Sequence, residues 1–469
     1  MEKLAPYAQW GGREYVTMPM PNLMSQPKHT VGHWLATAPQ AFLQSPRFSA
    51  GREQRMAIVA AGLWFLAQLL YLHYLSGIPW PWLESLVEAA AVVIIGGFPV
   101  LWWAVGKQDF ETIARRWPRR LLLSLGLYIS IGLLLPQVTY FRWHRILSNL
   151  IFADQPWLNL LIFLGGVWAM VRVPFLLRQK TVPRPVLWGW ISGAALYLLL
   201  SHSGLISPAF EHSEGFVITP LYLLLCAWGD WQRHHLPKEK PTGLGWQHLP
   251  LIAVSLFSLY WFSTPYFRFG PLVALQLFIL VIIFGTGLGR SHFGYSFEPR
   301  WRDARLLGAM FLGALLTMVP LGSLLGFLPL AQFNFTPSLL QVFVYSTLFA
   351  LRVGIFEEVL FRSGLMIFVR DLLQHYRGDR YPPVVLAWGA ILICSLLFGI
   401  VHMGNEPNAN IQLPLLVYRG VYILMATFAS LFYCLAFACT QRLWAGVILH
   451  GLVDAIAVVF FGAALVAPF

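Results

Sequence analysis

Long apolar runs, each of about 20 residues, recur along this chain and are separated by short polar stretches. A bilayer core offers no water to the backbone, so a chain crosses it as an α-helix or within a closed β-barrel. The runs are continuous rather than alternating, which indicates helices. The composition agrees, since 58% of the residues are hydrophobic and 11% are charged. We therefore predict an all-α fold, a polytopic transmembrane helical bundle.

The runs divide the chain into regions. Residues 1–55 contain no such run and are expected to form a cytoplasmic N-terminal tail, and residues 56–230 form an N-terminal transmembrane region. The polar segment 231–248, which contains Pro and Gly, is the best candidate for a linker. Residues 249–469 form a C-terminal transmembrane region. We expect about 13 spans, at roughly 56–76, 83–106, 121–140, 157–177, 186–206, 216–229, 249–263, 270–289, 305–328, 338–369, 384–403, 414–440 and 443–468.

The chain is basic, with 32 Lys and Arg against 20 Asp and Glu, but the placement of these residues argues against a nucleic-acid partner. If the N-terminus is cytoplasmic, the loops on that side carry 25 Lys and Arg, whereas the outside loops carry Arg142, Arg145, Arg268 and Arg419. Cytoplasmic loops of membrane proteins are enriched in Lys and Arg. We therefore predict a cytoplasmic N-terminus and, with 13 spans, an outside C-terminus.

Two adjacent glutamates and an arginine lie inside the apolar run at 338–369: Glu357, Glu358 and Arg362. A charged side chain at the centre of a bilayer costs about 2.5–3.5 kcal/mol on insertion scales, so three in one helix indicate a functional site. Glu358 and Arg362 are four residues apart on one helical face, in the order that favours an ion pair. Glu357 points about 100° away from Glu358, which leaves its carboxylate for chemistry.

Two later runs place further polar side chains at helical spacing. Phe398 and His402 share one helical face, and His450 and Asp454 share another. A lone histidine at a helix end is commonly an interfacial residue, but three adjacent helices of a bundle can bring several polar groups into a single cavity. We therefore expect both histidines and Asp454 to converge with Glu357.

Taken together, these side chains form three motifs on successive helices. The motifs are Glu357-Glu358-x-x-x-Arg362, Phe398-x-x-x-His402 and His450-x-x-x-Asp454. Their type and order resemble the motifs of the CAAX protease and bacteriocin-processing family (CPBP, or Abi), which includes the CAAX prenyl endopeptidases and many bacterial membrane proteins. The resemblance covers about residues 340–460 and leaves the N-terminal half uncovered. It implies an intramembrane glutamic-type endopeptidase, in which the first glutamate activates water, the histidines complete the site and a final asparagine helps to hold the oxyanion.

The last motif departs from that family pattern, because position 454 is Asp rather than Asn. An ionised carboxylate cannot donate a hydrogen bond to an oxyanion. Either Asp454 is kept protonated by its apolar surroundings and the nearby carboxylates, or it is ionised and orients His450. We favour the second interpretation, since a carboxylate four residues along a helix can reach the imidazole.

The motifs predict hydrolysis of peptide bonds in membrane-associated substrates. Glu357 would take a proton from a bound water, the histidines would stabilise the tetrahedral intermediate, and Arg362 would neutralise Glu358. No Ser or Cys forms a recognisable nucleophile motif beside these residues, so we expect direct attack by water. The candidate site residues are Glu357, Glu358, Arg362, His402, His450 and Asp454.

Three alternatives remain open. Histidines and carboxylates could hold a divalent metal such as zinc, although the compact His-Glu-x-x-His spacing of a zinc protease helix is absent. The same fold could be a non-proteolytic membrane scaffold or regulator, in which the buried charges only lock helix packing. A transporter is the third alternative, although the two halves show no matching pair of interrupted segments.

The expected setting follows from these features. The partners are the lipid bilayer and a protein or peptide substrate in or at the membrane, without nucleic acid and without a cofactor. The expected location is a bacterial cell membrane, as a multi-pass integral protein. At about 1.5 Å per residue, Glu357, His402 and His450 lie about 20, 28 and 12 Å from the predicted cytoplasmic ends of their helices. Convergence therefore requires that the helix of Glu357 or that of His402 extends beyond the membrane.

Overall fold

The structure is a computed structural model of the 469-residue chain. It describes residues 50–76, 81–105, 243–248, 290–298, 301–328, 333–378, 380–404 and 413–462, with a few single positions between 192 and 330. Residues 1–49 of the predicted tail at 1–55 and the predicted spans at 121–140, 157–177 and 216–229 lie outside this part, as do nearly all residues of the predicted spans at 186–206, 249–263 and 270–289.

The described residues form helices and turns and contain no strand, which confirms the all-α prediction for this part of the chain. Within it, six helices are long and apolar enough to cross a membrane. The total of 13 spans and the sidedness of the termini stay predictions. The six helices are Gly51–Leu75, Trp301–Leu324, Leu339–Arg377, Pro383–Val401, Leu415–Thr440 and Leu443–Phe461.

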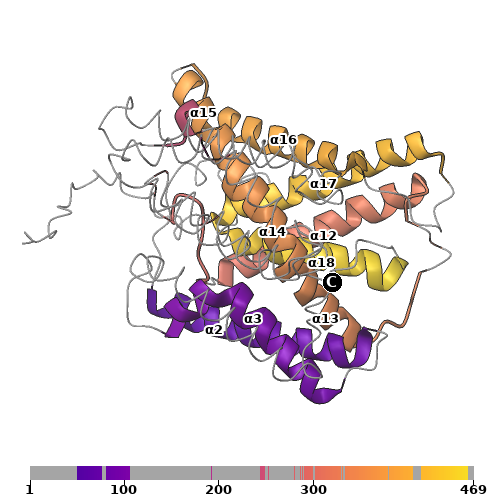
Figure 1. Cartoon of the computed structure of the whole chain (residues 1–469). Helices are drawn as coiled ribbons and strands as arrows, with labels where there is room; N and C mark the ends of the chain where they lie inside the picture. Colours follow the sequence, from indigo (N-terminus) through magenta and orange to yellow (C-terminus); the bar gives the residue numbers. More distant parts are fainter. Residues whose placement is uncertain are drawn as a thin grey trace, which may run out of the picture.

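A helical hairpin forms the N-terminal described part. Its arms are α2 (Ala50–Leu70), which continues as a π-helical turn to Leu75, and α3 (Trp82–Val105). The hairpin packs against the beginning of the long helix Leu339–Arg377, where Tyr71 and Tyr345 meet edge to face with ring centroids 6.4 Å apart. Figure 1 shows this hairpin in indigo, beside the orange and yellow helices of the C-terminal region.

The long helix of 39 residues carries the glutamate pair. Its Gln341 side chain accepts a hydrogen bond from the Ser338 backbone N–H at 3.3 Å, as in a capping box. Figure 1 shows that the helix runs obliquely across the neighbouring spans. π-helical turns, which often mark functional sites, flank the glutamates on both sides. The successive segments are α13 (Leu339–Leu348), a π-helix (Phe349–Gly354), α14 (Ile355–Glu358), a second π-helix (Val359–Met366) and α15 (Ile367–Arg377).

Four further helices complete the C-terminal bundle. Because α17 contacts both α16 and α18, and α18 contacts the long helix, the motif-bearing helices are neighbours. Pro383 occupies the first turn of α16, where its missing N–H costs no helical hydrogen bond. The turn between α17 and α18 has two residues, and Gln441 adopts a left-handed conformation with φ 54°. The helices are α12 (Trp301–Leu324), α16 (Pro383–Val401), α17 (Leu415–Thr440) and α18 (Leu443–Phe461).

Glycines allow the motif helices to approach closely. A Cβ atom at Gly451 of α18 would collide with Ala350 of the long helix, and one at Gly399 of α16 would collide with Thr427 of α17. Small residues at such crossings let helix backbones pack by close contact, which is the main source of association inside a membrane. The sequence therefore brings the glutamate helix against α18, and α16 against α17.

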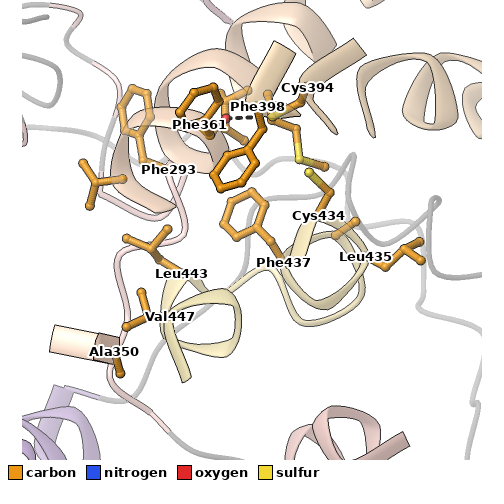
Figure 2. Packing of buried hydrophobic residues seen from close by; sticks show 14 of the residues in the cluster. Phe293, Ala350, Phe361, Cys394, Phe398, Cys434, Leu435, Phe437, Leu443 and Val447 are labelled. Atoms are coloured by element: carbon orange, nitrogen blue, oxygen red, sulfur yellow. Dashed lines mark hydrogen bonds between the residues drawn. The ribbon is translucent and has the colours of Figure 1, made fainter. Parts of the chain in front are cut away.

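A buried apolar cluster joins these helices beside the predicted site. Phe361 of the long helix and Phe398 of α16 meet edge to face, with ring centroids 4.9 Å apart. Figure 2 shows both rings beside Phe293, and marks the hydrogen bond of 3.2 Å that the Cys394 thiol donates to the Phe361 carbonyl. The cluster holds the three motif helices at fixed distances from one another.

Candidate active site

All six predicted site residues lie within one polar cluster enclosed by the long helix, α16, α17 and α18. Glu357 and Glu358 end α14, and Arg362 lies one turn further along the long helix. His402 begins the short 3-10 helix His402–Gly404 that ends α16, and the last motif lies in the middle of α18. Residues up to 97 positions apart in the sequence thus share one site.

Glu357 is the point on which the histidines converge. Its Oε2 atom lies 3.7 Å from Nε2 of His402 and 3.7 Å from Nε2 of His450. These distances are too long for direct hydrogen bonds, but they suit a water molecule that bridges the carboxylate and the imidazoles. The Glu357 side chain is 24% exposed, whereas its Oε2 atom is buried and has no direct hydrogen-bond partner among the described residues, as expected of an atom that binds such a water.

His402 is held by the helix that carries it. Its Nδ1 atom lies 2.7 Å from the carbonyl oxygen of Phe398, one turn earlier. A carbonyl only accepts hydrogen bonds, so Nδ1 carries the proton and Nε2 faces Glu357. The imidazole stacks on Tyr422 of α17, with ring centroids 5.8 Å apart and an interplanar angle of 15°. The spacing of Phe398 and His402 therefore fixes both the tautomer and the ring plane.

His450 is held by the second glutamate. Its Nδ1 atom lies 3.0 Å from Oε1 of Glu358, which fixes the ring so that Nε2 faces Glu357 and Asp454. The Oδ2 atom of Asp454 is 3.4 Å from that Nε2 atom. On its face, the imidazole stacks on Tyr433 with ring centroids 4.5 Å apart. Both histidines thus present Nε2 to the same carboxylate.

Glu358 and Arg362 form a fully buried ion pair, with Nε and Oε2 3.1 Å apart. The guanidinium also donates a hydrogen bond of 2.8 Å to the Ser430 hydroxyl. It lies over the rings of Phe398 and Tyr433, at 4.7 and 5.3 Å from their centroids. Glu358 therefore links Arg362 to His450, a role beyond charge neutralisation.

Sequence reasoning missed the contribution of α17. Tyr422, Ser430 and Tyr433 each contact a motif residue, although none belongs to a motif. Tyr422 and Tyr433 are 11 residues apart, which is close to three full turns, so they share one helical face. Two tyrosines on one face of a transmembrane helix are a signal that could have found them.

Among the residues that the structure describes, no group of three or more His, Cys, Asp or Glu side chains is arranged to hold a metal ion. The hydrogen bonds of both Nδ1 atoms nevertheless leave both Nε2 atoms directed into the site. The site therefore combines two oriented imidazoles with carboxylates, inside a helical membrane bundle.

This combination defines a class: a multi-pass membrane protein with a buried glutamate–histidine site. Residues 337–456 match the model of the family described as Rce1-like, type II CAAX prenyl endopeptidase Rce1-like. The match confirms the family resemblance for the C-terminal region, about a quarter of the chain, and includes all six candidate residues. It suggests a protease of the CAAX type. No curated protein and no solved structure matches the chain.

Proposed function

We propose that this protein is an intramembrane endopeptidase that hydrolyses peptide bonds of membrane-associated substrates, in a bacterial cell membrane. The observation that carries the proposal is the convergence of both histidine Nε2 atoms on one oxygen of Glu357, at 3.7 Å each. Each imidazole is fixed through its Nδ1 atom, so the arrangement is set before substrate binds.

The reaction begins with a water molecule held between Glu357 and the imidazoles. Glu357 takes a proton from the water while the water oxygen attacks the carbonyl carbon of the scissile peptide bond. The carbonyl oxygen becomes the oxyanion of a tetrahedral intermediate. Glu357 then returns the proton to the departing nitrogen, and the C–N bond breaks to give a carboxylic acid and an amine.

The histidines supply the stabilisation of the oxyanion. An imidazolium donates hydrogen bonds from both nitrogens, so a protonated histidine can donate from Nε2 to the oxyanion while Nδ1 keeps its own partner. Asp454 lies 3.4 Å from Nε2 of His450, where a carboxylate favours the protonated form of the imidazole. This geometry supports the interpretation in which Asp454 acts through His450.

The first experiment compares peptide termini in membranes and secreted fractions of cells that carry the wild-type protein or Glu357→Gln at equal abundance. We expect a set of fragments in wild-type cells that Glu357→Gln abolishes. Glu84→Gln, at the start of α3 and outside the cluster, is the matched control and should keep these fragments. Identical termini in all three strains would refute the protease and favour a membrane scaffold.

This reaction needs no metal ion. Cleavage by the purified protein should therefore persist after treatment with a strong chelator. Loss of cleavage on chelation, with recovery when zinc is added back, would favour the metal-dependent alternative.

A further inference from the structure

The described helices run between two ends of the bundle, and these ends differ in their contacts. At one end, the beginning of α2 meets the 290–298 loop through an ion pair of 2.7 Å between Glu53 and Arg290. The same loop meets the end of the long helix, where His292 lies 2.8 Å from Asp371, and the α17–α18 turn, where Arg442 lies 3.5 Å from Glu298. We name this the basic end. The opposite end contains the α16–α17 connection.

The 290–298 loop closes the basic end. Phe293 is fully buried, and its carbonyl accepts a hydrogen bond of 2.8 Å from the Ser363 hydroxyl. The next residue, Gly294, accepts a hydrogen bond of 2.9 Å from the Leu443 backbone N–H. Gly294 has φ +71°, and a Cβ there would contact the Phe437 ring at 2.6 Å, so the loop lies tightly on the bundle. Figure 2 shows Phe293 and Phe361 on the same side of the cluster.

Exposure within the site decreases toward that closed end on each of the three motif helices. On the long helix, side-chain exposure is 24% at Glu357 and 0% at Arg362. On α18 it falls from 18% at Asp454 to 5% at His450. His402 at the end of α16 is 17% exposed, whereas Phe398, one turn nearer the basic end, is buried. The more exposed side chains of the site therefore lie on the side away from the basic end.

Charge distinguishes the two ends as well. The α16–α17 end has a single Lys or Arg residue, Arg419, among the residues that the structure describes outside the interior of the long helix. Lys and Arg concentrate on the cytoplasmic side of membrane proteins, so the basic end is the cytoplasmic one. The described arginines of the basic end are Arg52, Arg55, Arg290, Arg302, Arg305, Arg370, Arg377, Arg380 and Arg442.

We propose that the site opens at the α16–α17 end, toward the extracytoplasmic side, and is closed from the cytoplasm by the 290–298 loop. The class of substrate that follows from this opening rests on the proposed protease function. The substrates are then exported, membrane-anchored peptides, cleaved at a bond in the extracytoplasmic half of the bilayer. A cytoplasmic peptide tail cannot reach Glu357 without displacement of the loop.

The test measures the accessibility of single cysteines in the full-length protein to a charged, membrane-impermeant methanethiosulfonate, added to intact cells or to inside-out vesicles. Asp454→Cys reports on the site. Thr336→Cys, exposed in the connection before α13, marks the α16–α17 end, and Arg380→Cys, exposed beside the start of α16, marks the basic end. Glu358→Cys is the fully buried control.

We expect Asp454→Cys and Thr336→Cys to react in intact cells, Arg380→Cys to react only in inside-out vesicles, and Glu358→Cys to react in neither. Reaction of Asp454→Cys from the Arg380 side would overturn the proposal, and so would its failure to react from both sides while the markers react. Reversed sidedness of the two markers would overturn the extracytoplasmic assignment. Glu357→Cys serves the same purpose if Asp454→Cys does not accumulate.

Labelling does not depend on catalysis, so this result separates the two proposals. Extracytoplasmic labelling without any Glu357-dependent cleavage would leave the opening intact and refute the protease. Glu357-dependent cleavage with labelling from the basic end would support the protease and refute the extracytoplasmic opening.

Discussion

Replacement of Arg362 by methionine should destabilise the fold more than loss of any surface ion pair. The change leaves the Glu358 carboxylate fully buried beside an apolar side chain, and removes the hydrogen bond to Ser430. Removal of one partner from a buried pair costs about 3–5 kcal/mol, because the remaining charge stays desolvated. We expect a loss of this size in the free energy of unfolding, although methionine fills a similar volume.

The assay is unfolding of the purified protein in mixed detergent micelles by added SDS, followed by fluorescence of its 20 tryptophans. Arg52→Met is the control, since Arg52 is mostly exposed and Glu298 keeps its contact with Arg442; it should cost less than about 1 kcal/mol. The double variant Glu358→Gln/Arg362→Met leaves no uncompensated charge, so its cost should be less than the sum of the two single costs. Costs that simply add, or a loss below about 1 kcal/mol for Arg362→Met, would refute the buried pair.

Three further predictions concern the site and its supports. Asp454→Asn, which restores the residue usual in the resembling family and keeps an oxygen that can accept a hydrogen bond from Nε2 of His450, should keep peptide cleavage, whereas Asp454→Leu should lower kcat by about 100-fold; wild-type rates in both variants would show that Asp454 has no part in the reaction. Tyr422→Phe should cleave normally, whereas Tyr422→Leu should lose about 0.5–1.5 kcal/mol of stacking on His402 and up to about tenfold in rate; a wild-type rate in Tyr422→Leu would contradict a positioning role. Gly399→Val should lower the SDS midpoint of unfolding by separating α16 from α17 at Thr427, and an unchanged midpoint would show that the helices do not approach as closely as described.

Much of the local structure could be predicted from the sequence. Continuous apolar runs predict helices because the backbone must satisfy its own hydrogen bonds in lipid, and the described part contains helices without strands. The ion pair of Glu358 and Arg362 follows from four-residue spacing on one helical face. His450 and Asp454 meet for the same reason. These features depend on neighbours along one helix, which the sequence displays directly.

Contacts between helices were harder to predict. Straight spans perpendicular to a bilayer would set Glu357, His402 and His450 at different depths, yet their side chains meet. The long helix has 39 residues, far more than the roughly 20 that cross a bilayer, and it runs obliquely (Figure 1). Tilt depends on packing against neighbouring helices, and single-helix periodicity carries no information about it.

The motifs also did not predict the positions of α17 and of the 290–298 loop. Tyr422 and Tyr433 contact the histidines from a helix that carries no motif, and Phe293 reaches the core from a loop about 70 residues before Ser363. The tyrosines leave a periodic signal, but the insertion of Phe293 depends on a tertiary fit that local sequence does not encode. The N-terminal spans between residues 121 and 229 stay predictions, since they lie almost wholly outside the described residues.

The central claim is that Glu357 activates water for hydrolysis of a peptide bond. Its most direct test uses the purified full-length protein, a synthetic peptide that spans a cleavage site found from the comparison of termini, and water enriched in ¹⁸O. We predict that the wild-type protein yields fragments whose new carboxyl terminus contains one ¹⁸O atom, and that Glu357→Gln yields none of these fragments. Cleavage by Glu357→Gln at the wild-type rate would contradict the role assigned to this carboxylate.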